Sequence, residues 1–191
     1  LHTATLVHDD IIDNSDLRRG KTTVNVAWSN SHGVLIGDFI YSKAFMLMNE
    51  IGNFKVIDEL SSATNKIAEG ELMQLANKNN LNTSLQQLKK ISYYKTGRLF
   101  EASAKSAAML SGKSIPFIEN ISKAAKLIGI AFQVRDDLLD YGVSKGNIGK
   151  PEMQDILEDK ITYPLYFALK YSNKKDSSKI LKKLKNKDFS I

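Results

Sequence analysis

The chain has 191 residues, a formal net charge of +6 and 42% hydrophobic residues, which indicates one globular domain spanning residues 1–191. The absence of cysteine excludes a disulfide scaffold and thiolate metal sites, and no uncharged apolar run is long enough to span a membrane, so we expect a cytoplasmic protein. Because the chain opens at Leu1 inside an apolar-periodic run, we expect further sequence upstream, and the C-terminus is open to the same expectation.

Apolar residues recur at helical spacing along almost the whole chain, which predicts an all-α fold. Residues 34–49, VLIGDFIYSKAFMLMN, are apolar on most sides and predict a helix buried in the centre of a bundle, with a partner for Asp38. Ser84 with Gln87 predicts a capping box, and Ser114 before Pro116 predicts another helix start. Loops are expected at residues 20–33, 52–53, 77–83, 111–113 and 141–151.

The net positive charge is concentrated at residues 173–187, NKKDSSKILKKLKNK. This stretch lacks the interleaved aromatic residues that stack on bases, so no nucleic acid is expected as a partner. It is more compatible with a solvated surface or with an anionic membrane surface, and we expect peripheral membrane association.

Residues 8–20, HDDIIDNSDLRRG, gather acidic side chains at the end of an apolar run. At about 100° per residue, Asp9 and Asp13 share one helix face and Asp10 lies to one side. An isolated cluster of this kind is more often a solvated face paired with lysines. The enclosed apolar pair, Ile11 and Ile12, instead indicates a largely buried helix whose carboxylates point into a polar cavity or bind a cation. Oxygen ligands without His or Cys suit Mg²⁺, completed by phosphate oxygens of a substrate.

The same spacing returns at Asp136, Asp137 and Asp140, again at the end of an apolar helix. Two such helices facing each other would form a strongly negative pocket that is unstable without divalent cations. The repetition therefore favours a metal site over two unrelated solvated faces.

Basic residues near the two clusters are suited to hold a diphosphate. Arg18 and Arg19 follow the first cluster, and guanidiniums bind phosphate oxygens bidentately. Lys95 lies among largely uncharged neighbours, whereas Lys150 and Lys160 follow the second cluster; each of these lysines alone is more often a surface residue.

These segments resemble those of the trans-isoprenyl diphosphate synthases, most closely the long-chain, octaprenyl-like branch. The first block is HDDIIDNSDLRRGKTTVN, and the later blocks follow in the family's order: GDFIYSKAF, IAEGELMQL, YYKTGRLFEASA and AFQVRDDLLDY. The resemblance extends from Leu1 to about Leu169. Met153 stands where the family commonly has a glycine, and the family's upstream Gly-Gly-Lys block lies outside this sequence.

The resemblance implies an isoprenoid synthase-type helical bundle around a central cavity with two facing aspartate-rich helices, a homodimer, and Mg²⁺ as cofactor. It implies condensation of isopentenyl diphosphate with an allylic prenyl diphosphate. The implied metal ligands are Asp9, Asp10, Asp13, Asp136, Asp137 and Asp140, and all of these except Asp140 are also implied to be catalytic. The implied contacts to the allylic substrate are Arg18, Lys95, Thr96, Gln133, Lys150 and Lys160, with Lys95 also catalytic. Arg19 is implied to contact isopentenyl diphosphate.

The residues one turn before the first cluster predict product length. Short-chain synthases of the family close the floor of the product cavity with aromatic residues there, whereas this chain has Ala4 and Thr5. Two small residues predict a medium-to-long all-trans product, the length class of quinone side chains, although they could also serve close helix packing.

Two other functions are alternatives to chain elongation. A terpene cyclase would be expected to carry an Asn/Asp, Ser/Thr, Glu metal motif in place of the second cluster and no Arg-Arg-Gly. A non-catalytic partner subunit of a synthase predicts erosion of one aspartate cluster, and both are intact here.

Overall fold

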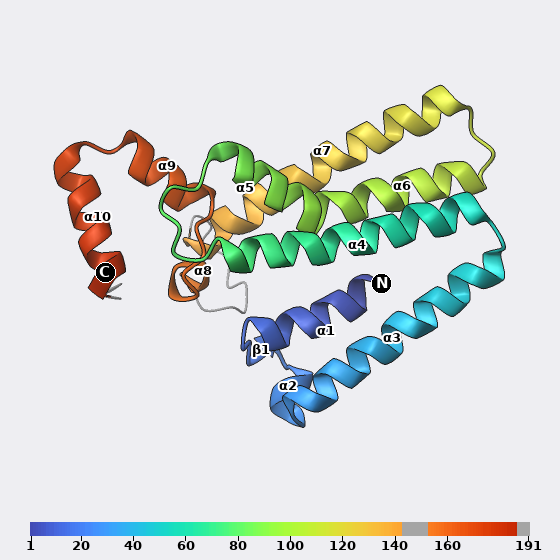
Figure 1. The fold of residues 1–191 in the computed structure, drawn as a ribbon, viewed down its shortest axis with the longest axis horizontal. Coiled ribbons are helices and arrows are strands. Elements are labelled where there is room, and N and C mark those ends of the chain that lie inside the picture. Colours follow the sequence, from blue (N-terminus) through green and yellow to red (C-terminus); the bar gives the residue numbers. More distant parts are fainter. Residues whose placement is uncertain (143–152, 187–191) are drawn as a thin grey trace. The chain divides into compact units, whose positions relative to one another are not determined.

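The computed structural model describes residues 1–142 and 153–186 (Figure 1). Within these residues the chain is helical apart from one short hairpin, which confirms the all-α prediction. The helices and strands, in chain order, are α1 (His2–Ile12), β1 (Leu17–Arg18), β2 (Lys21–Thr22), α2 (Val24–Ala27), α3 (Asn30–Ile51), α4 (Phe54–Ala76), α5 (Leu85–Ser92), the π-helix η1 (Tyr93–Gly97), α6 (Arg98–Leu110), α7 (Ile115–Asp140), α8 (Gln154–Leu157), α9 (Tyr163–Tyr171) and α10 (Lys174–Asn186).

The described residues form two compact units. The first comprises residues 1–65 and 99–125, and the second comprises residues 66–98, 126–142 and 153–186. The long helices α4 and α7 contribute residues to both.

In the first unit, α1 packs closely on α3 because α3 carries glycines where they meet. A β-carbon on Gly33 would lie 2.6 Å from Cδ1 of Ile11, and one on Gly37 would lie 2.2 Å from Nε2 of His8. The His8 ring nitrogen instead contacts the carbonyl oxygen of Val34 at 3.2 Å and Oδ1 of Asp38 at 3.3 Å. The prediction that Asp38 has a partner is confirmed, and the end of α1 that bears the first aspartate cluster is fixed against α3.

The prediction that residues 34–49 are buried on most sides is wrong for the described chain. Leu35, Phe39 and Met46 on α3 are 67%, 62% and 54% exposed. The helices α1 and α2 contact α3, and the two close glycines of α3 face α1. An apolar helix sequence alone does not distinguish a face buried within the chain from one available to a partner.

The loop predicted at residues 20–33 is also not confirmed in full, since β2, α2 and the first turn of α3 lie within it. Strands of two residues and a helix of four are too short to produce a readable hydrophobic period. The start of α3 is marked by Ser29, whose hydroxyl oxygen accepts a hydrogen bond from the His32 amide at 3.3 Å.

Buried polar contacts join the helices of the first unit. Nζ of Lys105 on α6 lies 2.5 Å from Oε2 of Glu59 on α4, and the Ser122 hydroxyl donates to Glu101 at 3.3 Å. Around these pairs the core is made of small side chains; Ala63 and Ala102 have no exposed surface. Small residues allow the helices to approach closely.

In the second unit, α5 opens with the predicted capping box between Ser84 and Gln87, which is confirmed. It continues without a break into η1 and then α6, while α9 contacts α5 and α10 contacts α9. The helix α7 begins in the first unit at Ile115, directly after Ser114 as predicted. Within the described residues, no helix combines the length and apolar character needed to cross a membrane.

Candidate active site

Both aspartate clusters lie at the C-terminal end of a helix. Asp9 and Asp10 belong to the last turn of α1 with Asp13 as its C-cap, and Asp136, Asp137 and Asp140 end α7. The helix dipole is negative at this end, and the last turn of neither helix contains a basic residue. Carboxylates placed there destabilise the helix, which favours a role in binding cations over a role in stability.

The first cluster has one buried carboxylate, and an arginine from the following hairpin contacts it. Asp10 is 6% exposed, and Nε of Arg18 donates to its Oδ1 at 2.6 Å. The hairpin pairs Leu17 with Thr22 and Arg18 with Lys21, so its loop contains two residues. The structure therefore brings together two residues that the sequence separates by eight positions.

Arg19 and Gly20 form that two-residue loop, and both have positive φ, 53° and 74°. Positive φ at both positions defines the turn whose twist suits an antiparallel hairpin. Glycine adopts it freely, whereas arginine pays a steric cost, so an arginine here suggests a functional demand. The Arg19 side chain is exposed at the tip. Buried Thr23 anchors the hairpin by donating to the carbonyl oxygen of Ser15 at 2.7 Å.

The second cluster also has a buried middle carboxylate, but its hydrogen-bond partner is neutral. Asp137 is 6% exposed, and Nε2 of Gln133 donates to its Oδ1 at 2.8 Å. Burial raises the pKa of Asp137 to about 6, and the charge of Asp136 adds to this rise. The hydrogen bonds from Gln133 and from the Tyr163 backbone, and the charge of Lys95, lower the pKa. The Thr96 hydroxyl donates to Oε1 of Gln133 at 2.5 Å, so predicted site residues Thr96, Gln133 and Asp137 form one chain of hydrogen bonds.

Lys95 lies beside this chain and is held from α4. Its Nζ lies 2.7 Å from Oε1 of Glu71 and donates to Oε1 of Gln74 at 2.5 Å. A small cavity within the second unit is lined by Gln74, Lys95, Gln133 and Asp137, among others. Glu71 and Gln74 were not identified as site residues from sequence; their only signal was their place in the block IAEGELMQL.

Asp140, the third aspartate of the second cluster, caps α8. Its carboxylate oxygens accept the backbone N–H groups of Gln154 and Asp155 at 3.1 and 3.0 Å. Burial raises the pKa of Asp155 to about 7, and the charges of Asp140 and Asp137 raise it further. Asp155 is thus a member of this acidic region that the sequence analysis missed, because its spacing repeats neither cluster.

The remaining predicted residues occupy varied settings. Lys160 is 8% exposed, and its Nζ lies 2.5 Å from Oε2 of Glu158. Lys150 lies outside the described residues. Ala4 has no exposed surface, and the Thr5 hydroxyl donates to the carbonyl oxygen of His2 at 2.8 Å.

The donor chemistry of both clusters fits a hard divalent cation. Each offers carboxylate oxygens at a negative helix end, and each contains a buried aspartate. Across residues 1–142 and 153–186, the structure has no group of three or more His, Cys, Asp or Glu side chains that could hold a metal ion. Mg²⁺ does not require such a group, because it usually keeps waters and is bound by one or two carboxylates plus substrate phosphates.

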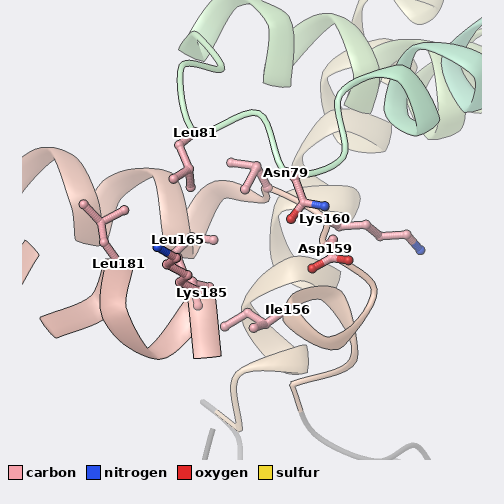
Figure 2. A pocket seen from close by; sticks show the side chains of 10 residues that line it. Asn79, Leu81, Ile156, Asp159, Lys160, Leu165, Leu181 and Lys185 are labelled. Carbon is pink, nitrogen blue, oxygen red and sulfur yellow. The ribbon is translucent and has the colours of Figure 1, made fainter. Parts of the chain in front are cut away.

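A second cavity in the same unit has a different character. It has a volume of about 360 Å³ and lies against α9, α10 and the loop after α4 (Figure 2). Apolar side chains, including Leu81, Ile156, Leu165 and Leu181, make up much of its wall. Lys160 reaches both its wall and the neighbourhood of Asp155, while Lys185 lies at its α10 side.

Comparisons with known proteins show the family of this chain. A sequence model of the polyprenyl synthetase family matches residues 1–190. The octaprenyl diphosphate synthase of Escherichia coli (strain K12) is 42% identical over 180 residues, covering 94% of this chain and 56% of the relative. The all-trans-nonaprenyl-diphosphate synthase (geranyl-diphosphate specific) of Rhodobacter capsulatus is 42% identical over 169 residues, covering 88% of this chain and 52% of the relative. The chain therefore spans about half the length of these curated relatives.

Solved structures share the fold. The polyprenyl synthase of Caulobacter crescentus CB15, crystallised with calcium and isoprenyl diphosphate, superposes with a TM-score of 0.92 at 36% identity, covering 99% of this chain and 58% of that one. A decaprenyl diphosphate synthase from Rhodobacter capsulatus gives a TM-score of 0.90 at 35% identity, with coverage of 99% and 58%. The fold is the all-α isoprenoid synthase fold, and the chain belongs to the polyprenyl synthetase family.

Proposed function

We propose that this protein is a Mg²⁺-dependent, chain-elongating trans-prenyltransferase that condenses isopentenyl diphosphate with an allylic prenyl diphosphate. The observation that carries the proposal is the repeated Asp-Asp-x-x-Asp spacing, each copy ending a helix and each with its middle aspartate 6% exposed. Chain-elongating synthases among the relatives support the direction of the reaction.

The side chains have separable tasks in this reaction. The allylic carbon–oxygen bond breaks, the double bond of isopentenyl diphosphate attacks the resulting cation, and a proton is lost to the released diphosphate. Mg²⁺, when bound by the aspartate clusters, neutralises the charge that develops on the departing diphosphate. Arg18, Lys95, Thr96, Gln133, Lys150 and Lys160 bind and orient the allylic diphosphate, and Arg19 binds isopentenyl diphosphate.

The contact of Arg18 with Asp10 is compatible with its task. A guanidinium has five N–H donors, and the bond to Asp10 uses the one on Nε. The terminal nitrogens of a guanidinium form a fork suited to two phosphate oxygens. An arginine oriented by Asp10 therefore has the chemistry to bind diphosphate without a large loss of side-chain entropy.

The direct test is condensation by the intact protein. We would supply labelled isopentenyl diphosphate, allylic primers of increasing length and Mg²⁺, and identify the products by chromatography. Elongated prenyl diphosphates support the proposal. A cyclic hydrocarbon made from the primer alone identifies a terpene cyclase, and no turnover without a second subunit identifies a partner protein.

We propose a medium-to-long all-trans product, of the length used for quinone side chains. Ala4 and Thr5 carry this part of the proposal, because aromatic residues there would shorten the space for the tail. Thr5→Tyr is expected to shift the product distribution to shorter chains. Ala4→Phe should do the same with a folding cost of about 1–3 kcal/mol, since Ala4 has no exposed surface. A wild-type distribution of only C15 or C20 products would contradict the length assignment.

We also propose a homodimer that functions in the cytoplasm. The support is the apolar stripe of α3, where Leu35, Phe39 and Met46 recur at helical spacing and are more than half exposed in the described chain. Phe39→Glu is expected to convert the dimer to a monomer in light scattering after size exclusion, whereas the control Lys123→Glu, at an exposed position of α7 outside the stripe, should not. Monomeric wild-type protein would contradict the proposal.

Release of a long prenyl tail is compatible with peripheral membrane association of the lysine-rich segment 173–187.

A further inference from the structure

Lys95 is contacted by two side chains of α4 that the proposed reaction does not use. Its ammonium lies 2.7 Å from Oε1 of Glu71 and donates to Oε1 of Gln74 at 2.5 Å. The side chains of Lys95 and Glu71 are only 18% and 16% exposed. An ammonium has three N–H donors, and two acceptors on one helix limit the positions that it can take.

The backbone makes this contact possible at two places. A β-carbon on Gly70 would lie 2.8 Å from the backbone nitrogen of Lys95 and 2.8 Å from Cβ of Tyr94, so α4 approaches η1 at a distance that only glycine allows. Glu71 follows directly, and Gln74 lies one turn later. The segment that carries Lys95 is a π-helix, a local widening that is frequent at functional sites.

The same segment connects Lys95 to the second aspartate cluster. Thr96, the next residue, donates to Gln133, and Gln133 donates to Asp137. The charge of Lys95 acts on Asp137, and both residues line the small cavity described above. The contacts of Lys95 with α4 therefore also fix the position of a positive charge that acts on the Asp137 carboxylate.

We propose that Glu71 and Gln74 are positioning residues for Lys95, which hold its ammonium in the place where it binds an oxygen of the allylic diphosphate. The inference rests on the proposed function, because it requires that Lys95 binds that substrate. A free lysine loses rotamer freedom when it binds a ligand; a lysine already held by α4 has lost that freedom during folding.

The alternative is that the ion pair only ties α4 to η1. A structural tie of this kind would change the melting temperature and leave the two substrates equally affected. A positioning pair acts through Lys95 and changes the kinetics of the allylic substrate selectively. Its effect must also disappear when the lysine is removed.

The experiment compares Glu71→Gln, Gln74→Leu and a control in the intact protein, each in the wild-type and Lys95→Met backgrounds. The control is Glu69→Gln, because Glu69 on the same helix has its own lysine partner, Lys66, at 2.6 Å. The measurements are kcat/KM for each substrate and the melting temperature. We expect Glu71→Gln to lower kcat/KM for the allylic diphosphate about tenfold, the scale of residues that orient a ligand-binding group. We expect Gln74→Leu to do so less strongly, because it removes no charge.

The outcomes are distinct. With the positioning role, both α4 variants leave the KM for isopentenyl diphosphate within the range of the Glu69→Gln control and have no further effect in the Lys95→Met background. Equal losses for both substrates, or losses that persist without Lys95, overturn the positioning role alone. A Lys95→Met protein with wild-type kinetics for the allylic substrate overturns the assigned role of Lys95, and intact wild-type protein without condensation activity overturns both proposals.

Discussion

Asp10 and Asp137 hold the same place in their clusters, and each is 6% exposed, but their neighbours differ. Asp10 receives a guanidinium from the hairpin that follows it. Asp137 receives the neutral amide of Gln133, and burial raises its pKa to about 6. The comparison teaches that an identical motif can be compensated differently. One copy is compensated by a permanent charge, and the other mainly by hydrogen bonds from neutral groups, to which the charge of Lys95 adds.

The flanking aspartates differ as well. Asp140 accepts two backbone N–H groups of α8, so the third position of the second cluster stabilises local structure in addition to any metal role. Asp13, at the same position of the first cluster, is instead the C-cap of its own helix. In the second cluster, the third aspartate is held by contacts with α8. In the first cluster, the middle aspartate is held by a contact with the hairpin.

The largest expected effect is on catalysis, and it tests whether the two clusters share a task despite these differences. Asp9→Ala and Asp136→Ala should each lower the condensation rate by about 10³-fold, because each removes a carboxylate proposed to hold Mg²⁺ against the departing diphosphate. Steady-state kinetics at saturating Mg²⁺ measure this. Asp16→Ala, an exposed acid near the first cluster, is the matched control. Near wild-type turnover in one variant would restrict the metal assignment to the other cluster.

A smaller effect, on stability, separates the two arginines of the hairpin. Arg18→Gln leaves the buried carboxylate of Asp10 without its charged partner and should lower the free energy of unfolding by about 3 kcal/mol. Arg19→Gln changes an exposed tip residue and should stay within about 0.5 kcal/mol of wild type.

Denaturant titration gives the two free energies, and substrate kinetics complete the comparison. We expect Arg18→Gln to weaken mainly the binding of the allylic diphosphate, and Arg19→Gln to weaken mainly the binding of isopentenyl diphosphate. Equal stability of the two variants would show that the contact between Arg18 and Asp10 contributes nothing to the fold. A rise in the same Michaelis constant in both would contradict their separate roles.

Sequence patterns predicted the long helices because each contains enough turns to establish a period. The capping box at Ser84 and the helix start after Ser114 follow from local chemistry and were confirmed. The hairpin, α2 and α8 are too short for periodicity, and η1 differs from an α-helix only in its hydrogen-bond spacing, which leaves no mark on apolar patterning.

The site was predictable where its residues sit in one motif and was not where they meet through packing. The aspartates and Arg18 could be identified from spacing and charge. The contacts of Glu71 and Gln74 with Lys95 depend on the close approach at Gly70, which lies 25 positions from Lys95 in sequence and carries no signal for that contact. The proximity of Asp155 to Asp140 likewise depends on the contact between the start of α8 and the end of α7.

The smallest expected effect concerns Met153, where the resemblance found in the sequence leads us to expect a glycine. Met153 has φ 65° and ψ 23°, the left-handed conformation, at the N-cap of α8, and its amide donates to the carbonyl oxygen of Asp140 at 2.7 Å. A side chain in this conformation costs about 1–2 kcal/mol, whereas glycine adopts it freely but loses more entropy on folding. Met153→Gly should therefore raise the free energy of unfolding by about 0.5–1 kcal/mol. Met153→Ala keeps the β-carbon and should give no gain, which makes it the matched control. If denaturant titration shows equal stability for both variants, the backbone at Met153 is not strained. The helix α8, whose first amides bind Asp140 of the second cluster, then forms without a steric cost at its N-cap.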